Sequence, residues 1–115
     1  MNALNRLGLI LVLVLFSMNL SANDESRLSD CAKIVRKFYS KNAQRSDVPR
    51  GFEASHVLKA PTPLLGLQKQ ELAVYDEDML VYRGSGSMHS GYFIDLIVAN
   101  AQTCQPLQIF NIYSE

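Results

Sequence analysis

The chain contains 115 residues, 48% of them hydrophobic, and its 11 Lys and Arg residues balance 11 Asp and Glu residues. This length favours one domain over two, and the lack of net positive charge argues against a nucleic-acid-binding protein. The two cysteines, Cys31 and Cys104, do not form a CxxC pair, so the sequence offers no zinc site of the usual spacing.

Residues 1–22 have the pattern of a secretory signal. A short segment with the positive charge of Arg6 precedes an unbroken apolar run, residues 7–16, which is followed by small and polar residues. Ten apolar residues in a helix span only about 15 Å, roughly half of a bilayer core, so we expect a cleaved signal peptide ending at Ala22 rather than an uncleaved anchor. The mature protein would then be one periplasmic or secreted domain, residues 23–115.

The first element expected in this domain is an amphipathic helix over residues 26–43. Its apolar side chains recur at spacings of three and four, at Leu28, Cys31, Val35 and Phe38. Asp24 or Ser26 could cap its first turn. The apolar stripe must pack against another element, and Cys31 lies within that stripe.

Residues 46–69 are harder to interpret, because proline and glycine interrupt short apolar stretches. Five such residues punctuate the segment: Pro49, Gly51, Pro61, Pro63 and Gly66. This composition predicts an irregular connector that holds one short strand or helical turn.

The remainder has the composition of an antiparallel sheet. Residues 72–75 and 79–83 flank an acidic turn and predict a hairpin, and residues 84–91 predict a polar glycine-serine loop. Residues 92–99 are apolar on both faces, which favours a central strand. A last strand is expected over residues 107–113, with Pro106 at its start, where a missing N–H costs least.

Together these elements predict an α+β fold, with one N-terminal helix packed on a three- to five-stranded antiparallel meander. In an oxidising compartment Cys31 and Cys104 are expected to form a disulfide that ties the helix to the last turn of the sheet. Closing a loop of this length contributes about 4 kcal/mol on the chain-entropy model. A reactive or metal-binding thiol is the alternative.

Two resemblances concern the ends of the mature chain and its general layout. The helix-then-sheet order, with Lys37-Phe38-Tyr39 late in the helix and the alternating ending from Pro106 to Tyr113, resembles the cystatin-like or nuclear-transport-factor-like fold group. That likeness implies a ligand pocket between helix and sheet, although the chain is shorter than the usual members and lacks their second helix and the tryptophan of their last strand. In size, signal and cysteine spacing the chain is also similar to periplasmic immunity proteins of the colicin M type, which implies a protein partner.

Catalytic motifs are not evident in the sequence. The two histidines, His56 and His89, accompany no G-x-S-x-G, HExxH or paired-carboxylate signature. The segment from Gly84 to Gly91 could cradle an anion with His89 as a base, but it precedes a strand rather than a helix, which favours a simple hairpin loop. The acidic residues 76–78 lack the further oxygen ligands of a calcium loop. We therefore expect no enzyme, cofactor or metal.

The first functional hypothesis is a protein-binding module, an inhibitor or immunity protein that blocks a toxin or a cell-wall-degrading enzyme. Basic residues concentrate in residues 27–50 and acidic residues in 71–95, and such a bipolar surface favours charge-steered docking. The candidate contact residues belong to the acidic turn and the glycine-serine segment: Asp76, Glu77, Asp78, Ser85, Ser87, Met88 and His89.

The alternative hypothesis is a small-ligand-binding domain with a pocket between the helix and the sheet. Phe38, Tyr82 and Tyr92 would line that pocket, and Asp95, placed in the expected central strand, would be its buried polar group. A closed apolar cavity containing Asp95 would favour this second hypothesis. A filled core with a protruding loop would favour the first. The sequence leaves the oligomeric state open.

Overall fold

The computed structural model describes residues 23–43, 51–88 and 91–115. The expected signal peptide and its cleavage position therefore lie outside the described residues. Within the described ranges, no helix has both the length and the apolar character needed to cross a membrane.

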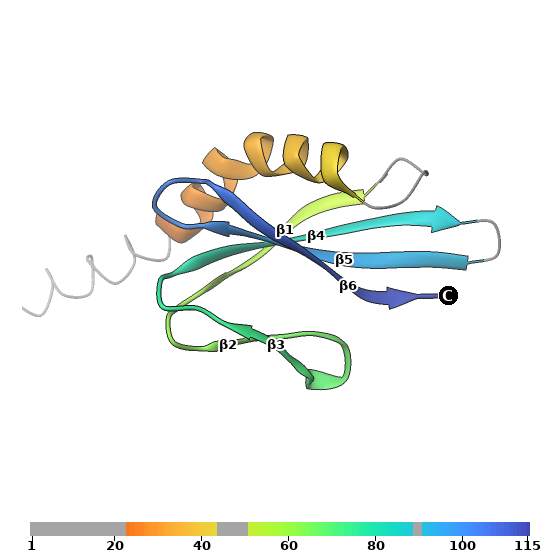
Figure 1. Cartoon of the computed structure of the whole chain (residues 1–115). Coiled ribbons are helices and arrows are strands. Elements are labelled where there is room, and N and C mark those ends of the chain that lie inside the picture. The colour runs from red at the N-terminus through yellow and green to blue at the C-terminus, as the bar shows by residue number, and fades with distance from the viewer. Residues whose placement is uncertain (1–22, 44–50, 89–90) are drawn as a thin grey trace, which may run out of the picture.

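A helix over residues 23–42 packs on one face of a four-stranded antiparallel sheet, and a two-stranded sheet covers the other face (Figure 1). The main sheet has the order β1 (Gly51–Leu58), β4 (Met79–Met88), β5 (Gly91–Asn100) and β6 (Pro106–Ser114). The small sheet pairs β2 (Pro63–Leu65) with β3 (Glu71–Val74). The predicted α+β class and the central position of β5 are confirmed.

The helix forms because one stripe of its surface is apolar. Cys31, Val35 and Tyr39, each four residues apart, are almost completely buried against the sheet. The disulfide between Cys31 and Cys104 joins this stripe to the β5–β6 turn, and the Arg27 guanidinium donates hydrogen bonds to the backbone carbonyls of Ala101 and Gln102 in the same turn. The predicted caps were wrong: Asp24 and Ser26 lie inside the helix, which is already formed at residue 23.

The two faces of the central strands form two separate cores. Leu80 and Tyr82 of β4 and Ile97 of β5 pack against the helix. Side chains alternate along a strand, so the residues between them point to the other face. There Val81 and Val98 pack under the β2–β3 hairpin. Because both faces are covered by apolar side chains, the core is filled on each side of the sheet.

The expected irregular connector contains more regular structure than predicted. Within it lie β1, β2 and a 3-10 turn, Leu67–Lys69. As an edge strand, β1 buries few side chains, and a register shift between Ala54 and His56 breaks its alternation. Its buried residue is Leu58 at the end of the strand, and the partly buried Phe52 ring stacks on that of Tyr82 with 5.2 Å between centroids. An edge strand with one bulge gives little period-two signal.

The predicted hairpin around the acidic turn was also wrong. β3 pairs with β2, whereas β4 pairs with β1 and β5, so residues 75–78 cross from one layer to the other. The Asp78 carboxylate accepts a hydrogen bond from the Ala60 amide at 2.9 Å and lies 3.7 Å from the Lys59 ammonium group. These contacts hold residues 75–78, which cross between the layers, against the segment that connects β1 to β2.

The predicted glycine-serine loop is largely strand, because β4 continues to Met88 and β5 begins at Gly91. One glycine of this segment, Gly84, is explained by packing rather than by a turn, since an added Cβ would lie only 2.2 Å from the Tyr39 ring. A glycine inside a strand often marks such a close approach. The glycine here makes room for the helix.

Candidate functional site

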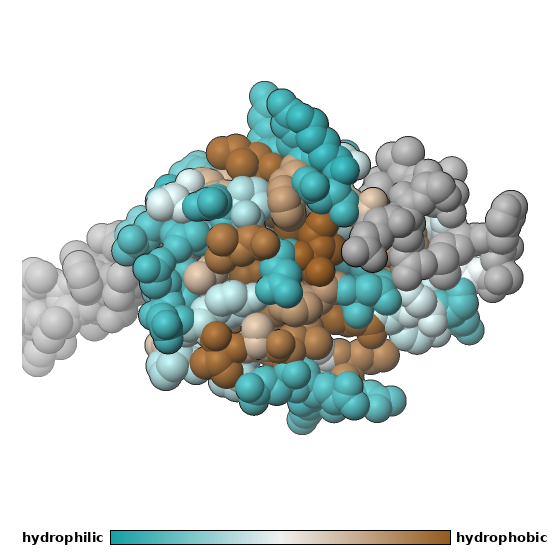
Figure 2. Space-filling view, viewed as in Figure 1, coloured by the Kyte–Doolittle hydropathy of each residue, from teal (hydrophilic) through white to brown (hydrophobic). Residues whose placement is uncertain are grey.

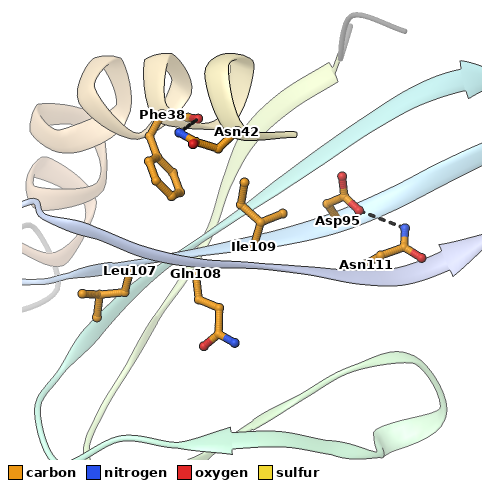
Figure 3. A pocket seen from close by; sticks show the side chains of 7 residues that line it. All are labelled: Phe38, Asn42, Asp95, Leu107, Gln108, Ile109 and Asn111. Atoms are coloured by element: carbon orange, nitrogen blue, oxygen red, sulfur yellow. Dashed lines mark hydrogen bonds between the residues drawn. The ribbon is translucent and has the colours of Figure 1, made fainter. Parts of the chain in front are cut away.

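An open groove of about 340 Å³ runs between the C-terminal half of the helix and the edge strand β6 (Figure 3). Side chains from the helix, β5 and β6 line it: Phe38, Asn42, Asp95, Leu107, Gln108, Ile109 and Asn111. In Figure 3, Phe38 and Ile109 point toward each other, whereas Leu107 and Gln108 point away from the helix and form the outer rim. The groove thus combines apolar walls with amide groups and one carboxylate.

Asp95 is the buried polar group of this groove, with 5% of its surface exposed. The Tyr39 hydroxyl donates a hydrogen bond to its Oδ2 at 2.8 Å, and the Asn111 Nδ2 donates to its Oδ1 at 2.9 Å. In the part of the chain that the structure describes, ion pairs join Lys59 to Asp24 and Asp78, and none involves Asp95. The carboxylate is therefore held by neutral donors alone.

The backbone explains why these three side chains meet. Asp95 lies opposite Gly84 on one side and opposite Asn111 on the other. The missing side chain at Gly84 lets the Tyr39 ring approach the sheet beside Asp95. The Asn111 amide is itself oriented, because its Nδ2 also donates to the Tyr113 carbonyl at 3.1 Å and its Oδ1 accepts from the Ser114 hydroxyl at 3.0 Å. The carboxylate is preorganised on rigid elements.

The face that contains the groove carries scattered apolar surface. Figure 2 shows this apolar surface between hydrophilic side chains above it and below it. Leu107, on the groove rim, is 44% exposed, and Val74, on the β2–β3 hairpin, is 53% exposed. Isolated apolar side chains are normal on protein surfaces, so the groove is distinguished by the buried carboxylate rather than by exposed carbon.

The chemistry of the groove suits binding. Among the described residues that line it, the polar groups are one carboxylate and several amides, with no serine, cysteine, histidine or lysine. Among the described residues, no group of three or more His, Cys, Asp and Glu side chains could hold a metal ion. A fixed carboxylate beside an aromatic ring can instead accept hydrogen bonds from a cationic group.

The acidic turn predicted as a contact surface lies outside the groove. Asp76 is exposed. The Glu77 carboxylate accepts a hydrogen bond from the Asn100 amide at 2.6 Å, and Asp78 holds the layer crossing described above. Two of the three carboxylates therefore have intramolecular partners that the sequence did not indicate.

The other predicted contact residues are not brought together with the acidic turn. Ser85 and Ser87 lie within β4, where Ser87 is exposed and Ser85 is partly buried. Met88 is the last residue of β4, and His89 lies outside the described residues. Ser85 and Ser87 do not line the groove.

Of the four residues expected around a pocket, two line the groove. Phe38 and Asp95 line the groove. Tyr82 is instead buried in the core, where its hydroxyl donates a hydrogen bond to the Leu28 carbonyl at 2.6 Å. This burial raises the pKa of Tyr82 to about 12, although the positive charge of Arg27 partly lowers it. Tyr92 is 46% exposed and stacks on Tyr113 with 5.0 Å between ring centroids.

The sequence interpretation missed Tyr39 and Asn111, the two hydrogen-bond donors of Asp95. A signal existed for each: Tyr39 places a hydroxyl at the end of the apolar helix stripe, and Asn111 interrupts the apolar alternation of the last strand.

Comparison of the chain with protein-family models, curated proteins and solved structures found no match to any of them.

Proposed function

We propose that this protein is an exported protein-binding module that inhibits or neutralises an enzyme or toxin outside the cytoplasm. The observation that carries the proposal is the open groove with its preorganised, buried Asp95 carboxylate. A recognition site of this kind needs a polar group fixed in place before the partner arrives, which limits the ordering cost of binding.

A protein partner fits the groove better than an enclosed small molecule. Both faces of the sheet are filled by apolar side chains, so the concavity available is an open one at the surface. Its outer wall is β6, an edge strand whose residues 106–114 include no charged side chain. An uncharged strand edge presents backbone donors and acceptors to which another chain can dock.

The charge distribution supports docking to a protein. The exposed helix surface carries basic side chains at Lys33, Arg36, Lys37 and Lys41, whereas residues 76–78 present carboxylates at the layer crossing. Separated charges of opposite sign orient a charged partner as it approaches and raise the association rate.

Two features taken together support export. The chain begins with the signal-like residues 1–22, and its cysteines are joined in a disulfide. Disulfides persist in compartments such as the bacterial periplasm and are rare in the cytosol. A periplasmic or secreted inhibitor or immunity protein satisfies both features.

Two variants that place the same charge at exposed apolar positions test this proposal. Leu107→Glu changes the groove rim, and Val74→Glu changes the distant hairpin. The oxidised protein is used to capture its partner from the envelope fraction of the producing cell, and affinity is then measured with the purified partner. Leu107→Glu should weaken binding by at least tenfold, Val74→Glu should leave it unchanged, and an equimolar amount of wild type should suppress the activity of the partner.

The opposite ranking of the two variants would overturn the groove as the contact surface. Capture of a small molecule in place of a protein would support the alternative, a cystatin-like ligand-binding domain. The observation in favour of that alternative is the position of Asp95 between helix and sheet, where the resemblance places a pocket.

A further inference from the structure

Asp95 is a buried acidic group that lacks a cationic partner among the described residues. Its surface is 95% buried, and its two oxygens receive hydrogen bonds from the neutral groups of Tyr39 and Asn111. Buried charges in proteins are normally paired or bound to metal, because an isolated charge is costly to remove from water. Each carboxylate oxygen has a second lone pair, so the group can accept two more hydrogen bonds.

We infer that the groove binds the guanidinium group of an arginine side chain from the protein partner, with Asp95 as its counter-ion. This inference rests on the proposed function and specifies the group that the partner presents. One hydrogen bond already occupies each oxygen of Asp95, which leaves one acceptor position on each of the two. Two parallel N–H donors of a guanidinium match that pair of acceptors, whereas an ammonium group is a point charge without this geometry.

The walls of the groove suit the rest of an arginine side chain. The Phe38 ring faces the interior on the far side of Ile109 from Asp95, where it offers apolar surface to the stem of a side chain whose cationic end lies at Asp95. Ile109 and the rim residue Leu107 offer carbon surface to the methylene stem, since long cationic side chains bury their stems along apolar surface. The side-chain oxygen of Asn42, on the helix side of the groove, is a further hydrogen-bond acceptor.

A bound metal ion fits these residues less well. Within the described parts of the chain, Asp95 is the one carboxylate that lines the groove, and no cluster of three or more acidic, histidine or cysteine side chains is present. Hard cations such as Ca²⁺ take six or more oxygen ligands, several of them from carboxylates. A carboxylate acceptor together with an aromatic wall is typical of sites for organic cations.

The test is an NMR titration of the oxidised protein with N-acetyl-arginine amide, using its neutral citrulline analogue and N-acetyl-lysine amide as comparison probes. Arginine amide should shift the amide signals of Phe38, Ile109 and Asn111, and the other two probes should bind at least tenfold more weakly. In the variant Asp95→Asn, arginine amide should also bind at least tenfold more weakly. Asp76→Asn removes the same charge from an exposed position and should bind like wild type.

The comparison of probes on wild type keeps the inference testable if Asp95→Asn does not fold. Equal binding of arginine and citrulline would overturn the inference, and equal binding of arginine and lysine would overturn the choice of guanidinium. Failure of every probe, with partner affinity still reduced by Leu107→Glu, would overturn the inference while leaving the proposed function in place. Loss of that Leu107→Glu effect, with arginine still selected, would overturn the proposed function instead.

Discussion

The variant Gly84→Ala tests how the helix and the sheet together position Asp95. The added Cβ would lie 2.2 Å from two carbons of the Tyr39 ring and 2.4 Å from its hydroxyl oxygen, whereas ordinary contact begins at 3.4 Å. The ring must therefore retreat by about 1.2 Å, which is the difference between these distances. Because the hydroxyl donates to Asp95 at 2.8 Å, such a retreat would break that hydrogen bond.

The expected cost follows from both effects. Overpacking of a filled core costs about 1–3 kcal/mol, and a lost hydrogen bond to a charged group adds to it, so the free energy of unfolding should fall by about 3 kcal/mol. For a domain of this size, the melting temperature should fall by about 15 °C. Thermal unfolding followed by circular dichroism measures the change. Gly66→Ala serves as the control, since the nearest atoms to its Cβ would be those of the Leu72 side chain, at 3.1 Å or more.

A second measurement separates this contact from other causes of instability. In a Tyr39→Leu background the ring is absent, so adding Gly84→Ala should cost less than about 1 kcal/mol. The reasoning is refuted if Gly84→Ala alone leaves stability within about 0.5 kcal/mol of wild type, or if its cost is the same in both backgrounds.

Three further predictions concern the disulfide, a buried tyrosine and the acidic turn. Replacing Cys31 and Cys104 by alanine should lower the free energy of unfolding by about 4 kcal/mol in urea titrations, and a loss under about 1 kcal/mol would contradict the entropic argument for a separation of 73 residues. Because burial raises the pKa of Tyr82 to about 12, the folded protein keeps that proton while the unfolded chain loses it near pH 10. Stability should therefore decline between these pH values, and a decline of equal size in Tyr82→Phe would contradict the assignment. Asp78→Ala should cost about 1 kcal/mol because the Ala60 amide loses its acceptor, whereas Asp76→Ala should stay within about 0.5 kcal/mol, and equal costs would be inconsistent with the layer crossing.

The sequence is most informative where burial and periodicity agree. The helix stripe around Val35 and the two-faced apolar strand around Ile97 are buried as predicted, because their patterns reflect contacts with the core on one or both faces. The disulfide was also predictable, since it needs only two cysteines and an oxidising compartment. These features were sufficient to predict the fold class.

The sequence is least informative where one residue serves a distant contact. Gly84 resembles a loop residue in its local context, and its role depends on Tyr39, which lies 45 positions earlier in the chain. Strand pairing of residues 71–74 was misassigned because an acidic turn between two short strands is typical of a hairpin, and nothing local shows that the chain changes layer. The sequence indicated only part of the groove, because the two residues that donate hydrogen bonds to Asp95, Tyr39 and Asn111, lie far apart in the chain.

The most direct test of the account is photo-crosslinking in the producing cells. Benzoylphenylalanine is incorporated at position 107 on the groove rim or, as a matched exposed control, at position 74 on the hairpin. We expect position 107 to crosslink to one protein, with the adduct lost when Asp95→Asn is added, and position 74 to give no such adduct. Crosslinking from position 74 alone would contradict the account.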